Sequence, residues 1–433
     1  MSLLSLSGRR DASVRRRSAL ARASLLVATI AGFALGAARG EAGEVTWWVT
    51  EPAKDDATKI VAEFEKANPD VKIRLQTNPY GGLQNKILIA LRSGIPPDLI
   101  EAQTAWIVPY AATGKLQDIT DVVTARFARS DFVPASIDSS TAGGKIYGLP
   151  FQAEALAMFY RKDLFRAAGL DPEKPPLTWP EFIEAARKLT RTLPDGKRSF
   201  GYGIAGGGPE GQGNSLFRSL PYMWMNGGGI ISDDAKRAII NTPESVAGVR
   251  FYTDMFTSLK VSPPSTPEND GVQLRRLFMS GTIAMYQGTP TEIERLDKDS
   301  PGIDYGIAMM PAPVGKQTAA ILGGWAFILP ADAKNKTDAR RLLTFLADRD
   351  RIAGYTRTFP ALRAAMADAR FADPRLTAFK QMLDFARPQP TLDSWLEITA
   401  VYYRHLQEVL IGGATAQQAM DAAAKEIDRI LAR

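Results

Sequence analysis

The stretch Tyr147–Asp163, YGLPFQAEALAMFYRKD, is the one from which the rest of the chain is best interpreted. Its first half has the pattern of a β-strand, since Gly148 and Pro150 punctuate a short run that is otherwise apolar and almost uncharged. Glu154 places a carboxylate inside this run, and a carboxylate is costly to bury unless a partner binds it. We therefore expect a strand that crosses between two lobes, with Glu154 facing a ligand in the cleft between them.

Length and composition limit the possible classes of protein. A chain of 433 residues predicts about two domains of roughly 150–200 residues each. The apolar fraction of 45% and the charged fraction of 23% are typical of a soluble globular protein. The sequence has no cysteine and one histidine, His405, so disulfides and thiolate nucleophiles are excluded and multi-histidine metal sites have almost nothing to be built from. We expect neither a metal nor a cofactor.

Residues 1–43 have the pattern of an export signal. An arginine-rich start precedes the apolar run Ser24–Ala38, and cleavage near Ala42 fits the small residues there. The run is shorter than the ~20 residues that span a membrane, which disfavours an anchor. The pair Arg16-Arg17 leaves twin-arginine and general secretory export both open, and without a cysteine the protein is not a lipoprotein. The rest of the chain keeps 46 basic and 45 acidic residues, so its net charge is +1 and nucleic acid is not an expected partner.

The first third of the mature chain alternates strand and helix patterns. Strands are predicted at Val45–Thr50, Val71–Thr77 and Asp98–Ala102, with helices at Asp55–Ala67 and Leu83–Arg92 between them. This order predicts an α/β lobe with a mainly parallel sheet, where ligands bind beyond the carboxyl ends of the strands. The candidate ligand-binding residues that follow these strands are Glu51, Tyr80, Gln103 and Trp106.

The middle of the chain supplies further candidates. A flexible loop beside the cleft is predicted for the glycine-rich stretch Gly201–Gly213, because it lacks the Gly-Lys-Ser/Thr ending of a phosphate-binding loop. Directly after it come Asn214 and an apolar helix, Leu216–Met225, which carries Trp224. A strand at Thr282–Tyr286 then places Gln287 at its end. We expect Asn214, Trp224 and Gln287 to contribute to ligand binding.

A second crossing is predicted at Ala319–Pro330, AAILGGWAFILP. Paired glycines inside a strand pattern indicate a bulge or a close backbone approach, and a tryptophan beside them can stack on a ligand. This makes Gly323, Gly324 and Trp325 candidate binding residues. A turn is expected at Tyr355–Pro360, and from about Leu362 to the end the chain is expected to be helical.

The polar residues favour binding over catalysis. Glu51, Glu101 and Glu154 leave a glycosidase formally open as a distant alternative, but their spacing does not bring two of them together. Aromatic and amide side chains at strand ends are the groups that bind sugars, because ring faces stack on C–H patches while amides and acids bond to hydroxyls. The sequence therefore predicts a protein that binds a carbohydrate and is not an enzyme.

Several motifs, taken in order, resemble a known family. They are AEFEKANPDVKI, GIPPDLIEAQTAWIVPYAATGKL, KIYGLPFQAEALAMFYRKDLF, TWPEFIEAARKL, LFMSGTIAMYQG and GGWAFILP. Over essentially the whole mature chain they are similar to the periplasmic solute-binding proteins of ABC importers, the large family that includes the maltose-binding proteins. The resemblance implies a sugar-binding carboxylate at Glu154 and a second crossing at Gly323–Trp325. Through the segment TRTFPALR it also implies a ligand contact at Arg357.

Departures from the maltose-binding pattern bear on the ligand. Ala102 stands where the resemblance implies a stacking tryptophan, and Trp106 stands where it implies an arginine. A maltodextrin is therefore not the expected ligand, and Trp106, Trp224 and Trp325 are expected to form a differently shaped stacking surface. The alternative within the same fold is a polyol or glycerol-phosphate-type ligand. That ligand requires cations in the cleft, for which the candidates are Lys54, Arg161 and Arg357.

The resemblance implies a two-lobed periplasmic binding protein fold of the type II-like class, with lobes joined by crossing segments. We expect lobe one to comprise residues 44–152 and 326–361, and lobe two residues 153–325 and 362–433. A monomer of this kind closes around a mono- or oligosaccharide in the periplasm and delivers it to the membrane subunits of an ABC permease.

Overall fold

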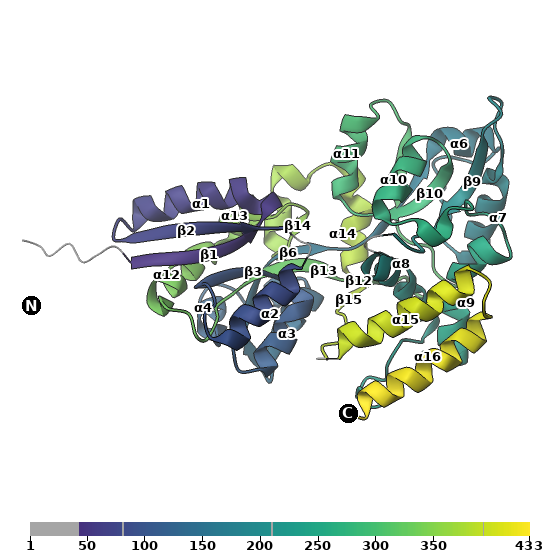
Figure 1. Cartoon of the computed structure of the whole chain (residues 1–433). Helices are drawn as coiled ribbons and strands as arrows, with labels where there is room; N and C mark the ends of the chain where they lie inside the picture. The colour runs from purple at the N-terminus through teal and green to yellow at the C-terminus, as the bar shows by residue number, and fades with distance from the viewer. Residues whose placement is uncertain (1–42, 80–81, 209–210, 393) are drawn as a thin grey trace, which may run out of the picture. The chain divides into compact units, whose positions relative to one another are not determined.

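The computed structural model describes residues 43–79, 82–208, 211–392 and 394–433, which are organised by two β-sheets (Figure 1). The predicted export signal and Tyr80 lie outside these residues. No helix in the described ranges combines the length and the apolar character that a membrane span requires.

The first sheet has six strands, in the order β14-β6-β13-β3-β1-β2. Its N-terminal half has the predicted β-α-β-α-β order, and β1 pairs in parallel with both β2 and β3. The elements of this half are β1 (Gly43–Thr50), α1 (Lys54–Ala67), β2 (Val71–Asn78), α2 (Leu83–Ser93) and β3 (Leu99–Gln103).

The other half of this sheet is antiparallel. β13 (Gly323–Ile328) pairs antiparallel with both β3 and β6 (Gly148–Glu154), and β14 (Phe359–Pro360) pairs antiparallel with β6. The expectation of a mainly parallel sheet is therefore wrong in this respect, and the sheet is mixed. The reason is topological: β13 and β14 return from the C-terminal half of the chain and run against the strands that they join.

The second sheet has five strands, in the order β11-β7-β10-β9-β8, and it is also mixed. β10 pairs in parallel with β9, while β7 pairs antiparallel with β10 and β11. Its strands are β7 (Ala157–Arg161), β8 (Arg191–Thr192), β9 (Arg198–Gly203), β10 (Ile283–Gly288) and β11 (Tyr305–Ala308).

The predicted first crossing is confirmed by the sheet order. β6 belongs to the six-stranded sheet and ends at Glu154, and β7 begins at Ala157 in the five-stranded sheet. Only Ala155 and Leu156 separate them. The second crossing is less direct, because β12 (Ala320–Ile321) pairs with β15 (Ala386–Arg387) in a two-stranded sheet before β13 enters the six-stranded one.

Helices cover the sheets, and short 3-10 turns join them (Figure 1). The remaining helices are α3 (Thr104–Ala112), α4 (Thr120–Thr124), α5 (Pro134–Asp138), α6 (Lys162–Ala167), α7 (Trp179–Leu189), α8 (Gly211–Asn226), α9 (Pro243–Thr257), α10 (Gly271–Met279), α11 (Thr291–Asp299), α12 (Lys336–Leu346), α13 (Arg349–Tyr355), α14 (Thr377–Leu383), α15 (Trp395–Leu410) and α16 (Ala416–Leu431). The C-terminal region is helical as predicted, although 3-10 turns and β15 interrupt it.

The glycine-rich stretch is a loop only in its middle. Its first residues belong to β9, residues 204–208 have no regular secondary structure, and its last residues begin α8. The glycines serve close packing here: a Cβ atom at Gly201 would lie 2.1 Å from the carbonyl oxygen of Ala186, and one at Gly207 would lie 2.0 Å from that of Pro267. A run of glycines therefore marked contact with neighbouring backbone rather than flexibility.

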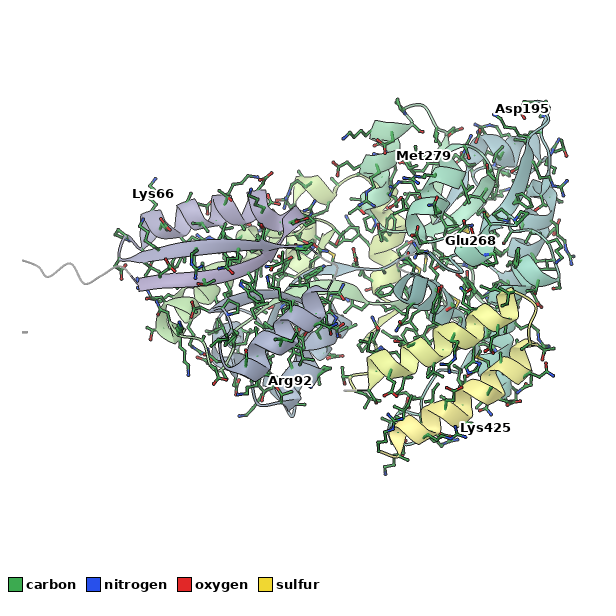
Figure 2. The ribbon with its side chains drawn as sticks, in the orientation of Figure 1. Lys66, Arg92, Asp195, Glu268, Met279 and Lys425 are labelled. Atoms are coloured by element: carbon green, nitrogen blue, oxygen red, sulfur yellow. The ribbon has the colours of Figure 1, made fainter. Side chains whose placement is uncertain are left out.

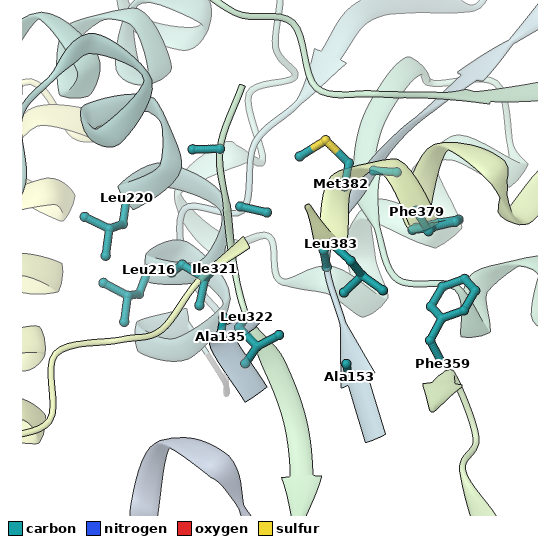
Figure 3. Close-up of a cluster of buried hydrophobic side chains, with 14 of the residues drawn as sticks. Ala135, Ala153, Leu216, Leu220, Ile321, Leu322, Phe359, Phe379, Met382 and Leu383 are labelled. Atoms are coloured by element: carbon teal, nitrogen blue, oxygen red, sulfur yellow. The ribbon is translucent and has the colours of Figure 1, made fainter. Parts of the chain in front are cut away.

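Buried apolar side chains hold the crossings in place. Figure 3 shows Ala153 of β6 close to Leu383 of α14, with Phe359 and Phe379 nearby, and Ile321 and Leu322 beside Leu216 and Leu220 of α8. In the six-stranded sheet, Phe151 stacks on Phe327 with ring centroids 4.4 Å apart. The strand that ends at Glu154 is thus fixed by packing on both faces up to the residue before it.

Candidate functional site

A cavity of about 760 Å³ lies where the first crossing meets helices of both halves of the chain. This volume is within the range of small-molecule sites. The side chains that line it come from the ends of β3, β6 and β13, from one face of α2 and α3, from the start of α8 and from the segment that leads into α15. Those of most interest are Leu88, Gln103, Trp106, Glu154, Gln212, Asn214, Arg218, Thr289, Trp325, Gln389, Trp395 and Leu396.

Glu154 is placed in this cavity by the register of the six-stranded sheet. It is the last residue of β6 and lies opposite Gly323 of β13. A Cβ atom on Gly323 would come within 2.7 Å of the Glu154 Cγ, so the glycine leaves room for the acid. Burial raises the pKa of Glu154 from 4.5 to about 7. No side chain or backbone group in the described residues hydrogen-bonds to its carboxyl group, which leaves that group available to a ligand.

Trp106 and Trp325 form an aromatic wall of the same cavity. Trp106 lies on α3, Trp325 lies on β13, and their rings meet edge to face with centroids 5.8 Å apart at 77°. Gln103 pairs with Trp325 in the ladder between β3 and β13 and also lines the cavity. Such a wall can stack on the C–H face of a sugar ring while the amide bonds to a hydroxyl group.

Gly324 fixes the position of this wall. A Cβ atom there would lie only 2.2 Å from the carbonyl oxygen of Gln152, so β13 and β6 approach more closely than a side chain permits. The ladder also changes register between Trp325 and Ala326. The close approach that the paired glycines predicted is therefore confirmed. Gly323 and Gly324 do not appear in the cavity lining; they lie behind Glu154 and Trp325.

Arg218 is a cavity residue that sequence reasoning missed. It lies on α8 and is 7% exposed. Its Nη1 donates to the Oδ1 of Asn214 at 2.8 Å, and its Nε donates to the carbonyl oxygen of Gln287 at 3.3 Å. Within the described residues no carboxylate pairs with it. A charged residue in an otherwise apolar helix is the same signal that drew attention to Glu154, and it could have identified Arg218.

The helical part of the wall was also missed. The cavity is also lined by Leu88 of α2, by Gln212 of α8 and by residues before and in the first turns of α15, namely Gln389, Pro390, Leu392, Trp395, Leu396 and Thr399. Nothing in the sequence separated these side chains from ordinary helix surface. Only the packing of α15 against α8 brings them to the cavity.

Several predicted site residues lie away from this lining. Gln287 is buried, and its Nε2 donates to the Tyr222 hydroxyl at 2.9 Å, so its amide is already used within the protein. Trp224 packs against the core, with the Arg387 guanidinium 5.8 Å from its ring centre. Glu51 and Arg357 are exposed and do not appear in the lining.

The cations proposed for a phosphate ligand also lie elsewhere. Lys54 is exposed at the start of α1. Arg161 binds Asp163 and the carbonyl oxygen of Phe278, at 2.6 and 2.8 Å. Arg218, together with the exposed Arg92 at the end of α2 (labelled in Figure 2), supplies the positive charge of the described lining instead.

The arrangement offers little for catalysis. Glu154 is the one carboxylate in the described lining, whereas a glycosidase requires two that flank the bond. Glu101 is buried elsewhere and bonds to Thr50 and Tyr355. Among the residues that the structure describes, no group of three or more histidines, aspartates or glutamates is placed to hold a metal ion.

Comparison with known proteins shows which family the sequence matches. Residues 48–350 match the family model described as bacterial extracellular solute-binding protein. The chain is 27% identical over 415 residues to the sn-glycerol-3-phosphate-binding periplasmic protein of Escherichia coli (strain K12), covering 87% of this chain and 90% of that protein.

Solved structures show the same fold. A solute-binding protein of an ABC transporter from Thermotoga lettingae, bound with alpha-D-tagatose, is 25% identical with a TM-score of 0.76, covering 90% of this chain and all of that one. The sugar-binding protein MalE of Xanthomonas citri has a TM-score of 0.79 at 22% identity, covering 90% and 97% of the two chains. The two-lobed α/β fold expected from the sequence is therefore confirmed.

Proposed function

This chain belongs to the family of bacterial extracellular solute-binding proteins, and we propose that its cavity captures a small carbohydrate for import by an ABC permease. One observation carries the proposal: Glu154, a half-buried acid whose carboxyl group has no bonding partner in the described residues, lines the same cavity as the Trp106–Trp325 pair. A sugar satisfies both, because its hydroxyl groups donate to the acid while its C–H face covers the rings.

Gln103, Asn214 and Arg218 complete a polar set around this core. The amide of Gln103 contains both a donor and an acceptor, the guanidinium of Arg218 donates only, and the Asn214 Oδ1 accepts from Arg218 and from the Gly271 N–H. Together with the Glu154 carboxyl group, the lining thus carries both kinds of group that hydroxyls can bond to. Because Arg218 is already held by Asn214 and Gln287, its orientation is fixed before ligand binds, which reduces the entropy lost on binding.

The proposed mechanism is closure of two lobes, residues 44–152 with 326–361 and residues 153–325 with 362–433. A ligand that touches both lobes binds the closed form more tightly than the open one and shifts the hinge equilibrium towards it. Glu154 lies at the crossing itself, next to Ala155 and Leu156, where the backbone passes from one sheet to the other. Membrane subunits of the permease would then recognise the closed monomer.

The same proposal implies where the protein acts and which activities it lacks. The protein would be exported through residues 1–43 and act in the periplasm as a binding protein, without enzymatic activity, cofactor or nucleic-acid partner. The net charge of +1 beyond residue 43 and the absence of cysteine support a soluble, non-lipidated form.

A glycerol-phosphate-type ligand is the second candidate, and Arg218 favours it. A buried guanidinium without a carboxylate partner in the described residues is suited to a phosphate group, for which bidentate bonding is common. The identity to the sn-glycerol-3-phosphate-binding protein of Escherichia coli points the same way. Against it stands Glu154, whose ionised form would repel an anion in the same cavity.

Ligand titration distinguishes the two candidates. The purified exported protein would be mixed with single sugars, short oligosaccharides and sn-glycerol 3-phosphate, while tryptophan fluorescence and Tm are followed. Three tryptophans at the cavity, Trp106, Trp325 and Trp395, provide the optical signal, and a bound ligand raises Tm by mass action. A sugar that raises Tm supports the main proposal, stabilisation by the phosphate alone supports the second, and a panel without effect contradicts both.

A further inference from the structure

The cavity has two ends of different chemistry. The end at the crossing strands carries Glu154, Gln103 and Arg218. The other end lies between α2 and the start of α15, and we name it the helix end: Leu88, Pro109, Gln212, Gln389, Trp395 and Leu396. A ligand that fills the cavity must therefore have two chemically different ends, one that fits the crossing strands and one that fits the helix end.

Polar groups at the helix end are largely bonded to each other. The Gln212 Nε2 donates to the Thr399 hydroxyl at 2.8 Å and to the carbonyl oxygen of Leu396 at 3.2 Å. The Trp395 Nε1 donates to the Gln389 Oε1 at 2.9 Å. On the opposite wall, the Tyr110 hydroxyl donates to the carbonyl oxygen of Gln84 at 2.9 Å. The donors of Gln212, Trp395 and Tyr110 are therefore already used, and a second sugar ring would have to break these bonds to reach them, which opposes its binding.

Apolar surface at the same end is left uncovered. Leu396 in the first turn of α15 is 55% exposed, although Trp395 beside it and Ile398 two residues later belong to the core. Leu88, Pro109 and Pro390 are only half-buried. Arg92 and Asn85, both exposed, stand beside Leu88 on α2. Covering this surface with an apolar group would be favourable, since it removes apolar area from water.

We infer that the helix end is an apolar subsite, and that the ligand is a glycoside whose aglycone, the non-sugar group, is an aryl or alkyl group. This inference rests on the proposed function, because the sugar of that glycoside occupies the end with Glu154. The ligand is amphiphilic: its hydroxyl-rich part lies against the crossing strands and its apolar part lies between Leu88 and Leu396.

Matched pairs of glycosides test this inference. For each of several sugars, Kd would be measured by calorimetry for the methyl glycoside, the phenyl glycoside and a disaccharide with the same sugar at its non-reducing end. We expect the phenyl glycoside to bind about tenfold tighter than its methyl partner, and tighter than the disaccharide. Equal Kd values for phenyl and methyl, or tightest binding by the disaccharide, would overturn the inference and leave the proposed function standing.

Two substitutions on one helix locate the effect. Leu396→Asn should reduce the phenyl-to-methyl ratio towards one, since it replaces apolar surface by an amide. Ile411→Asn is the matched control: Ile411 directly follows α15, is 69% exposed and does not line the cavity, so the ratio should keep its original value. A ratio that is unaffected by Leu396→Asn places the apolar contact elsewhere and contradicts the subsite. If no glycoside binds the unaltered protein, the proposed function fails with it.

Discussion

Glu101 and Glu154 lie on strands that both pair with β13, and burial raises the pKa of each to about 7. Around Glu101 the protein supplies its own partners: the Thr50 backbone N–H donates at 2.8 Å, and the hydroxyl groups of Thr50 and Tyr355 donate at 3.1 and 3.4 Å. Around Glu154 the described residues supply none, and the carboxyl group lines the cavity.

The comparison teaches that burial of a charge does not by itself identify a binding site. Burial raises the pKa of both acids to about 7, in Glu101 against the lowering by its hydrogen bonds and in Glu154 without such an opposing effect. What differs is whether the bonding capacity of the carboxyl group is used inside the protein or left for a ligand. Removal of a structural acid should therefore lower the free energy of unfolding, and removal of a ligand-binding acid should lower the affinity for the ligand.

The largest expected effect is on stability at Glu101. Glu101→Ala leaves the N–H of Thr50 and two hydroxyl groups without their acceptor in a buried place, and we expect a loss of about 3 kcal/mol in the free energy of unfolding. Urea denaturation followed by circular dichroism measures it. Glu101→Gln is the control, because its amide oxygen still accepts and the loss should be about 1 kcal/mol. A wild-type unfolding curve for Glu101→Ala would contradict the structural role.

The next effect is on affinity at Glu154. Glu154→Gln keeps the shape but replaces an acceptor of high capacity by an amide, and we expect binding to weaken by about 2 kcal/mol, roughly a 30-fold rise in Kd. The measurement is a titration with the sugar that stabilises the protein most. The unliganded variant should still fold, as its circular dichroism spectrum would show; if it unfolds instead, Glu154 belongs with Glu101 as a structural acid.

A smaller effect is the pH dependence of stability. The pKa of Glu154 is raised from 4.5 to about 7, so the folded state holds a proton that the unfolded state has lost between these values. Its contribution to stability is fully present below about pH 4.5 and is lost as the pH rises through 7. When the pH is raised from 5 to 8, the free energy of unfolding of Glu154→Gln should increase relative to that of wild type by about 1–2 kcal/mol. This is less than a fully buried acid would give, because the Glu154 side chain keeps some contact with water. Denaturation of both proteins at pH 5 and pH 8 tests this. The contribution of Glu101 to the pH dependence is the same in both proteins and cancels in the difference between them.

The smallest effect is expected at Glu51, the third acid considered. It is exposed in the 3-10 turn after β1 and does not line the cavity. Glu51→Gln should change neither stability nor affinity by more than about 0.5 kcal/mol. A fall in affinity comparable to that of Glu154→Gln would show that Glu51 reaches the ligand and would restore it to the site.

Features of the fold and of the site that arise from short-range sequence patterns could be predicted from the sequence. The strands β1, β2 and β3 with their helices follow from short-range patterns, and the predicted ranges match the observed ones within two residues. The last helix, Ala416–Leu431, lies in the region that was expected to be helical for the same reason. The crossing at Glu154 was predicted because a lone acid in an apolar strand is a local anomaly.

Features that depend on distant partners were not predicted. The helix α13 (Arg349–Tyr355) was not predicted, and the mixed sheets arise because β13 and β14 return to pair with β6, which no local pattern indicates. Gln287 has the sequence context of a binding residue, yet Tyr222, 65 positions earlier, uses its amide. Leu396 is an ordinary helix residue until α8 and α2 are placed around it. The predicted export signal stays a prediction.

Because β6 is held between β13 and β14, its last residue cannot be moved without disturbing the ladders on both sides. The helix end of the cavity is under no such constraint, since Leu88 and Leu396 project from helix surfaces. New ligand preferences are therefore expected to arise in evolution, or in directed engineering, by exchange of residues on α2 and α15. The end at Glu154 would change less readily, because an exchange there also alters the pairing of β6 with β13.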